Sequence, residues 1–116
     1  MKYFYLCLIS AFLIGCSKKD DSSNSLYASN DAEIIAYLEA NSIAATKTGS
    51  GLYYFISKQG TGASPVASSA VRVAYKGYFT SGRVFDQSNS TGISFSLNQV
   101  IPGWTEGLTY FKEGGE

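Results

Sequence analysis

The sequence contains no histidine, the side chain most often used for proton transfer near neutral pH. Without it the chain can form neither a Ser–His nor a Cys–His catalytic pair, and it lacks the commonest metal ligand. The two cysteines, Cys7 and Cys16, are too few for a disulfide scaffold. Nine Lys and Arg balance nine Asp and Glu, so there is no basic excess of the kind that indicates a nucleic-acid partner. No motif for a cofactor or a metal ion is present.

What the sequence does contain is enough apolar and aromatic material for one folded domain. Its 116 residues are 45% hydrophobic and 15% aromatic. This length suits one domain rather than two. The aromatic content argues against a chain that is disordered throughout.

The first sixteen residues read as an export signal. Lys2 precedes an apolar run over 3–14 that is broken only by Ser10. The run is shorter than the roughly 20 residues that span a bilayer, but it has the length of a signal-peptide core. It ends in Leu-Ile-Gly-Cys at 13–16, which resembles the lipobox of bacterial lipoproteins. We therefore expect removal of residues 1–15, lipidation of Cys16 and anchoring in a bacterial cell envelope; the alternative is a buried core helix with a chance cysteine.

The next segment is polar and is predicted to be a flexible tether over 16–30, because it cannot bury enough apolar surface to offset the entropy of ordering. A helix is predicted over 31–41, with Asn30 as its N-cap and Glu33 as a capping-box partner. Its apolar residues recur at helical spacing. Residues 31–50 are thus expected to form an accessory helix and linker before the main domain.

The main domain, residues 51–116, is predicted to be of the α+β class, an antiparallel sheet with a short helix. Strands are predicted from aromatic, β-branched or alternating segments at 52–57, 71–79, 83–86 and 93–97. A tight turn is expected at Ser81-Gly82. Pro102 is expected to open the helix, and Gly114-Gly115 to end it. Glu106, Lys112 and Glu113 are predicted to be solvated helix charges.

Four segments in order resemble the FKBP-type peptidyl-prolyl cis–trans isomerases, in the form found among bacterial lipoproteins. They are Val-Ala-Tyr-Lys-Gly at 73–77, Ser-Gly-Arg-Val-Phe-Asp-Gln-Ser at 81–88, Phe-Ser-Leu at 95–97, and Val-Ile-Pro-Gly-Trp-Thr-Glu-Gly-Leu at 100–108. The resemblance implies a sheet wrapped around the short helix. It also places the family's last strands and its later aromatic pocket residues beyond Glu116, so the sequence is expected to be truncated.

The resemblance implies a pocket made by Tyr75, Phe85, Asp86, Val100, Ile101 and Trp104, with Ile93 where many members carry an aromatic. Trp104 would form the floor, and the backbone N–H of Ile101 would donate to a substrate carbonyl. Asp86 would orient its polar neighbours. Taken singly, Trp104 and Tyr75 also read as core aromatics, and Asp86 reads as a turn residue.

The implied chemistry suits a chain without histidine, because rotation about an X–Pro bond needs no nucleophile, metal or titrating base. An apolar pocket disfavours the planar amide relative to the twisted one. The expected partners are proline-containing unfolded or exported polypeptides, macrolide ligands and, through the lipid, a membrane. Two alternatives stay open: a chaperone that binds proline segments without catalysis, and an inactive fragment.

Overall fold

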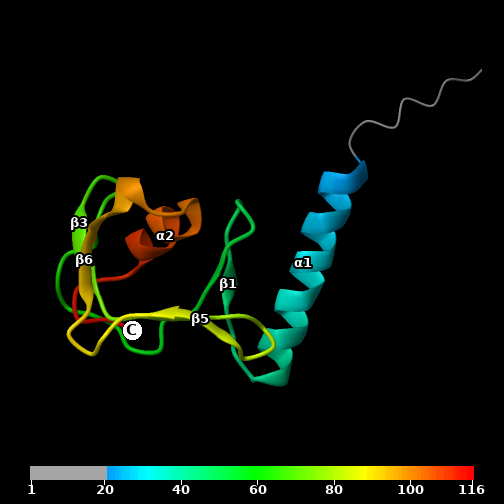
Figure 1. Cartoon of the computed structure of the whole chain (residues 1–116), viewed down its shortest axis with the longest axis horizontal. Helices are drawn as coiled ribbons and strands as arrows, with labels where there is room; N and C mark the ends of the chain where they lie inside the picture. The colour runs from blue at the N-terminus through cyan, green and yellow to red at the C-terminus, as the bar shows by residue number, and fades with distance from the viewer. Residues whose placement is uncertain (1–20) are drawn as a thin grey trace, which may run out of the picture.

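The computed structural model describes residues 21–116, so the predicted signal peptide and Cys16 lie outside the described residues. The first element is a helix, α1 (Asp21–Ala40), that stands beside the rest of the molecule and meets it near its C-terminal half (Figure 1). The prediction of a tether up to residue 30, and of Asn30 as the N-cap, is wrong for residues 21–30, because α1 covers these residues. Residues 17–40 contain no Gly or Pro, so a helix nucleated at 31–40 propagates toward the N-terminus at one hydrogen bond per residue. Side chains at 23–30 are exposed.

A small hairpin follows α1. Its strands, β1 (Thr46–Lys47) and β2 (Tyr53–Tyr54), pair antiparallel with Thr46 opposite Tyr54. The strand predicted over 52–57 is thus shorter than expected, and its partner β1 was not predicted. Residues 57 and 58 instead bond the C-terminal residue, with Ser57 N–H donating to Glu116 O at 2.8 Å.

The strand predicted over 71–79 is two strands with different partners. β3 (Ala70–Val73) pairs antiparallel with β6 (Ile93–Ser96), whereas β4 (Lys76–Tyr78) pairs antiparallel with β5 (Val84–Gln87). The strand is interrupted because the chain changes its pairing partner between Val73 and Lys76. The predicted alternation of burial still holds from 71 to 77, where odd-numbered residues are half-buried and even-numbered ones exposed.

The β4–β5 hairpin has the predicted turn and one irregularity. Gly82 adopts a φ of +89°, a value that favours glycine, and its N–H donates to Phe79 O at 2.8 Å. Gly77 lies opposite Asp86 and Tyr78 opposite Val84, so Phe85 has no direct partner. This is a β-bulge, which bends the strand next to Asp86.

The C-terminal part holds the short helices. After the 3-10 turn η1 (Leu97–Gln99), Pro102 opens α2 (Pro102–Gly107) as predicted, and a second 3-10 turn, η2 (Leu108–Tyr110), follows. The helix therefore ends before the predicted stop at Gly114-Gly115. Residues 112–116 run instead beside 58–63, where Glu113 N–H donates to Ala63 O at 3.1 Å.

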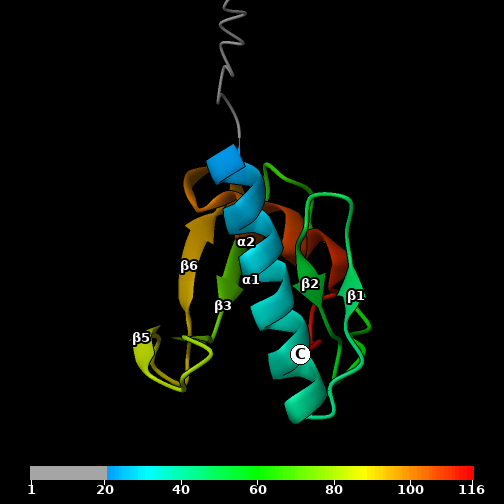
Figure 2. The ribbon, with the colours of Figure 1, turned by 90° about the vertical axis from the view of Figure 1, so that its right-hand side faces the viewer.

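These elements form the predicted α+β class: three antiparallel strand pairs and the short helix α2, with β3 and β6 beside α2 (Figure 2). Leu97, at the junction of β6 and η1, is the one fully buried side chain among residues 23–116. Within the described part of the chain, no helix has the length and apolar character needed to cross a membrane.

Candidate active site

Three aromatic rings from different elements meet beside α2. Trp104 lies one turn into α2, edge-on to the ring of Tyr75 at a centroid distance of 4.9 Å and an interplanar angle of 88°. Phe95 of β6 approaches the Trp104 ring at 5.3 Å. Edge-to-face and tilted pairs at these distances are favourable aromatic contacts. All three side chains are half-buried, so we call Tyr75, Phe95 and Trp104 the aromatic cluster.

The backbone holds Tyr75 at the break between β3 and β4. Its N–H donates to Ser88 Oγ at 2.9 Å, and its carbonyl accepts from Ser88 N–H at 3.0 Å. Ser88 follows β5 directly, so this double contact ties Tyr75 to the end of the strand that carries Asp86.

Asp86 is the charged group of the site. The Tyr75 hydroxyl donates to Asp86 Oδ2 at 2.6 Å, and Gln87 N–H donates to Oδ1 at 2.9 Å. This hydrogen bond to the carboxylate raises the pKa of Tyr75 above its usual value, and partial burial adds to the effect. The Tyr75 side chain therefore stays neutral, and its O–H bond points at Asp86.

Phe85 lies on the β4–β5 hairpin, 63% exposed. Its ring packs against Phe79 at 5.2 Å and covers Gly77, where an added Cβ would lie 2.5 Å from Phe85 Cζ. The structure thus gives Phe85 a place beside Asp86 but among hairpin residues, outside the aromatic cluster.

Three aliphatic residues complete the predicted set. Val100 is half-buried, while Ile93 and Ile101 are 44% and 67% exposed. The carbonyl of Ile101 caps α2 by accepting from Trp104 N–H at 3.0 Å. Within residues 21–116, no acceptor is bonded to the N–H of Ile101, which leaves this donor open next to Trp104.

The structure therefore brings Tyr75, Asp86 and Trp104 together, with Ile101 one turn away along the chain. It adds two residues that sequence reasoning did not assign to the site, Phe95 and Ser88. Both stood in the quoted motifs. The alternation of 93–97 marked Phe95 only as a half-buried strand residue, and nothing in the sequence showed that its ring meets Trp104.

Two hollows in the described residues lie elsewhere. A groove of about 820 Å³ runs between β3 and residues 108–116, and a second of about 520 Å³ includes Val100 and Pro102. Neither is lined by Tyr75, Asp86 or Trp104. The aromatic cluster is thus a partly open surface site. Within residues 21–116, no group of three or more Cys, Asp or Glu gathers as metal ligands would.

Comparison with known proteins defines the class. Residues 62–116 match the family model described as FKBP-type peptidyl-prolyl cis–trans isomerase. This range contains the whole aromatic cluster, Asp86 and all four motif segments. The match over residues 62–116 confirms the resemblance seen in the sequence.

Individual proteins similar to this chain carry the same family name or fold. The chain is 52% identical over 71 residues to a probable FKBP-type isomerase FkpA of Neisseria meningitidis, covering 60% of this chain and 26% of the relative. It is 36% identical over 110 residues to a probable FKBP-type isomerase of Haemophilus influenzae, covering 93% and 46%. The crystal structure of FkpA from Escherichia coli matches with a TM-score of 0.64 and 37% identity over 81% of this chain and 46% of that one. The chain thus spans less than half the length of these relatives, all of which are named as members of an enzyme class.

Proposed function

We propose that this chain catalyses cis–trans isomerisation of X–Pro bonds by binding the proline against the aromatic cluster. The observation that carries the proposal is the convergence of Tyr75, which lies between β3 and β4, with Asp86 of β5 and Trp104 of α2. The uncatalysed barrier is about 20 kcal/mol and arises from amide resonance. An aromatic surface that replaces water around the amide destabilises its planar, polar form relative to the twisted one.

In this proposal each residue has a defined role. Trp104 is the floor against which the prolyl ring packs, and Tyr75 is a wall whose hydroxyl is aimed by Asp86. The open N–H of Ile101 donates to the carbonyl of the substrate, where hydrogen bonding stabilises the twisted amide. Phe85 and Val100 supply apolar borders, and Ile93 lies at a secondary position.

The test is refolding of a protein whose slow phase is limited by proline isomerisation. Substoichiometric full-length chain is expected to accelerate that phase, and Trp104→Ala to remove most of the acceleration. Phe55→Leu is the matched control, because Phe55 is 50% exposed and lies outside the aromatic cluster. Acceleration that survives Trp104→Ala would show that the pocket assignment is wrong.

A second candidate function is binding of unfolded polypeptide without catalysis. The observation that favours it is a run of exposed apolar side chains on the β4–β5 hairpin, where Tyr78, Phe79, Val84 and Phe85 are 41–63% exposed. Exposed apolar patches commonly mark protein-binding surfaces. If the chain suppresses aggregation of an unfolded client but accelerates no proline-limited step, the binding function is the correct one.

We further propose that the protein is a lipoprotein of the bacterial cell envelope, acylated at Cys16, whose substrates are exported polypeptides. The support is the sequence at 1–16, a short apolar run that ends in Leu-Ile-Gly-Cys. A single cysteine residue that carries several acyl chains would anchor the protein stably, since each buried CH₂ contributes about 0.8 kcal/mol. Intact mass of the native protein from a membrane fraction tests this: loss of residues 1–15 with added acyl mass is expected, and a Cys16→Ser variant should lack both.

Macrolides that compete for a prolyl pocket are proposed ligands of the same site. Quenching or shift of Trp104 emission on titration is the expected signature, because Trp104 is the only tryptophan of the chain. Binding that leaves this emission unchanged would place the macrolide elsewhere.

A further inference from the structure

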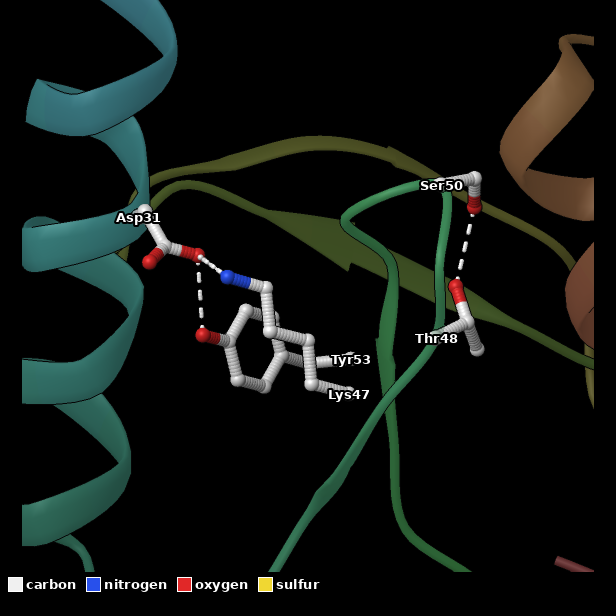
Figure 3. A network of polar contacts seen from close by, with 5 residues as sticks. All are labelled: Asp31, Lys47, Thr48, Ser50 and Tyr53. Carbon is white, nitrogen blue, oxygen red and sulfur yellow. Dashed lines mark hydrogen bonds and ion pairs between the residues drawn. The ribbon is translucent and has the colours of Figure 1, made fainter.

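Glu106 lies on α2, two residues after Trp104, and is not the solvated charge that the sequence predicts. Its two carboxylate oxygens lie 2.8 and 2.7 Å from Ser50 Oγ, and Thr48 Oγ1 lies 3.4 Å from Oε2. Thr48 Oγ1 is also 2.9 Å from Ser50 Oγ. We call Thr48 and Ser50 the hydroxyl pair. It lies at the end of the β1–β2 hairpin that faces α2 (Figure 3).

The direction of these hydrogen bonds follows from the groups. An ionised carboxylate accepts only, so Ser50 donates its one proton to Glu106, and Thr48 can then donate to Ser50. The turn that carries the hydroxyl pair is itself fixed by its backbone. Thr48 N–H donates to Leu52 O at 2.7 Å, and Gly51 N–H to Thr48 O at 3.1 Å. Glu106 is therefore held by a preformed turn.

Two further contacts align the same hairpin with α2 and η2. Leu52 packs on α2, where a Cβ added at Gly107 would lie 3.3 Å from Leu52 Cδ2. The Tyr54 ring stacks on Tyr110 of η2, with centroids 4.5 Å apart and planes 3° from parallel. The bond to Glu106 is thus the charged contact among those that join the hairpin to α2 and η2.

The opposite side of the hairpin is tied to α1. Asp31 Oδ1 accepts from Lys47 Nζ at 2.8 Å and from the Tyr53 hydroxyl at 2.8 Å. Figure 3 shows these groups pointing toward α1 while Ser50 points toward the other side. The hairpin therefore braces α2 against α1.

We propose that Glu106 is a positioning residue for the isomerase site, and that the hydroxyl pair sets the orientation of α2 and with it the contact of Trp104 with Tyr75. This rests on the proposed function for its effect on catalysis. Trp104 and Glu106 are two residues apart on a six-residue helix, so a tilt of α2 that follows loss of the Glu106 bonds moves the Trp104 ring as well. The property that we expect to change is the edge-on contact between the Trp104 and Tyr75 rings, whose interplanar angle is 88°.

The experiment compares Ser50→Ala, Glu106→Ala and the double variant in the full chain by Trp104 emission, acrylamide quenching, kcat and KM for a prolyl peptide. We expect each single change to lower kcat roughly threefold to tenfold, with KM changed less, because misplacement of a catalytic surface costs rate more than binding. Quenching of Trp104 should increase. The double variant should be no worse than Glu106→Ala alone, because Glu106→Ala already removes the interaction that Ser50→Ala removes.

Ser57→Ala is the control, since Ser57 is exposed and, among the described residues, no hydrogen bond joins its side chain to α2. Glu106→Gln keeps one carbonyl acceptor for Ser50 and should restore part of the rate and of the emission. If Glu106→Ala does not fold, Ser50→Ala, which removes a single oxygen atom, still decides. Unchanged emission and unchanged kcat in Ser50→Ala would overturn the proposal.

Failure of the proposed function is separable from failure of this inference. If wild-type chain shows no isomerase activity, Trp104 emission and quenching still report whether the hydroxyl pair orients α2. Altered emission in Ser50→Ala and Glu106→Ala would then support the positioning role, and additive effects in the double variant would contradict it.

Discussion

Replacement of Trp104 by leucine should lower both the stability of the aromatic cluster and the catalytic rate. The indole makes two aromatic contacts, edge-on to Tyr75 at 4.9 Å and tilted to Phe95 at 5.3 Å. Leucine retains an apolar body but loses both ring contacts, each worth about 0.5–1.5 kcal/mol. The expected loss in free energy of unfolding is therefore about 1–3 kcal/mol.

The effect on catalysis follows from the floor that the indole provides. Packing one face of a prolyl ring amounts to about half of a full side-chain burial, or roughly 0.8–1.5 kcal/mol. If this contact is made in the transition state, kcat/KM should fall roughly fourfold to tenfold. The assay is isomerisation of a prolyl peptide at a temperature where both variants are folded by circular dichroism. Phe55→Leu should keep the wild-type rate. A folded Trp104→Leu variant with wild-type kcat/KM would refute the reasoning.

Three further predictions concern stability, the hairpin and pH. Leu97→Ala should cost about 2–5 kcal/mol in urea unfolding, because Leu97 is fully buried, whereas Leu97→Met should cost under about 1.5 kcal/mol; equal losses would contradict this core assignment. Gly77→Ala should displace the exposed Phe85 ring and shift its NMR signals while changing stability by under about 1 kcal/mol; unmoved signals would mean that the close approach is absent in solution. Hydrogen bonds from Lys47 and then from Tyr53 hold the pKa of Asp31 below its usual 3.8, so Asp31 contributes stability above that value that is lost as pH falls through the lowered one. Lys47→Met should therefore lose less stability than wild type between about pH 5 and 3, and parallel profiles would show that the pair contributes nothing.

Local patterns in the sequence predicted the elements that depend on local physics. Pro102 opens α2 because its fixed φ suits the first helical position, and Gly82 makes the hairpin turn because the backbone there needs a positive φ. Alternation placed Val71 and Val73 on the inner face. The predicted lengths and boundaries of the strands and helices were wrong in several places. The strand over 71–79 divides where the chain changes partner, and this long-range pairing leaves no mark in the alternation.

The predicted boundary between the tether and the first helix was wrong for a similar reason. The polar composition predicted a flexible tether over 16–30, but the exposed side chains at 23–30 do not prevent a helix that continues from a neighbouring segment. Composition alone therefore could not separate a solvated helix from a coil.

The candidate site shows the same division. The motifs named Tyr75, Asp86 and Trp104, and the structure brings them together. The sequence predicts a solvated charge at Glu106 because nothing near it in the sequence suggests a partner. Its donors lie 56 and 58 residues away, on a hairpin whose first strand was not predicted. Pairings of this kind become visible only when the chain is folded.

The most direct test of the central claim is NMR exchange spectroscopy on a short peptide with one X–Pro bond, with catalytic amounts of the full chain added. The account predicts that the rate of cis–trans exchange rises in proportion to the amount of chain while the cis:trans ratio stays constant, since a catalyst does not move an equilibrium. Without catalyst the exchange takes tens of seconds or longer at 25 °C. An exchange rate that stays at that value at every concentration of folded chain, with or without a shift of the ratio, would contradict the claim.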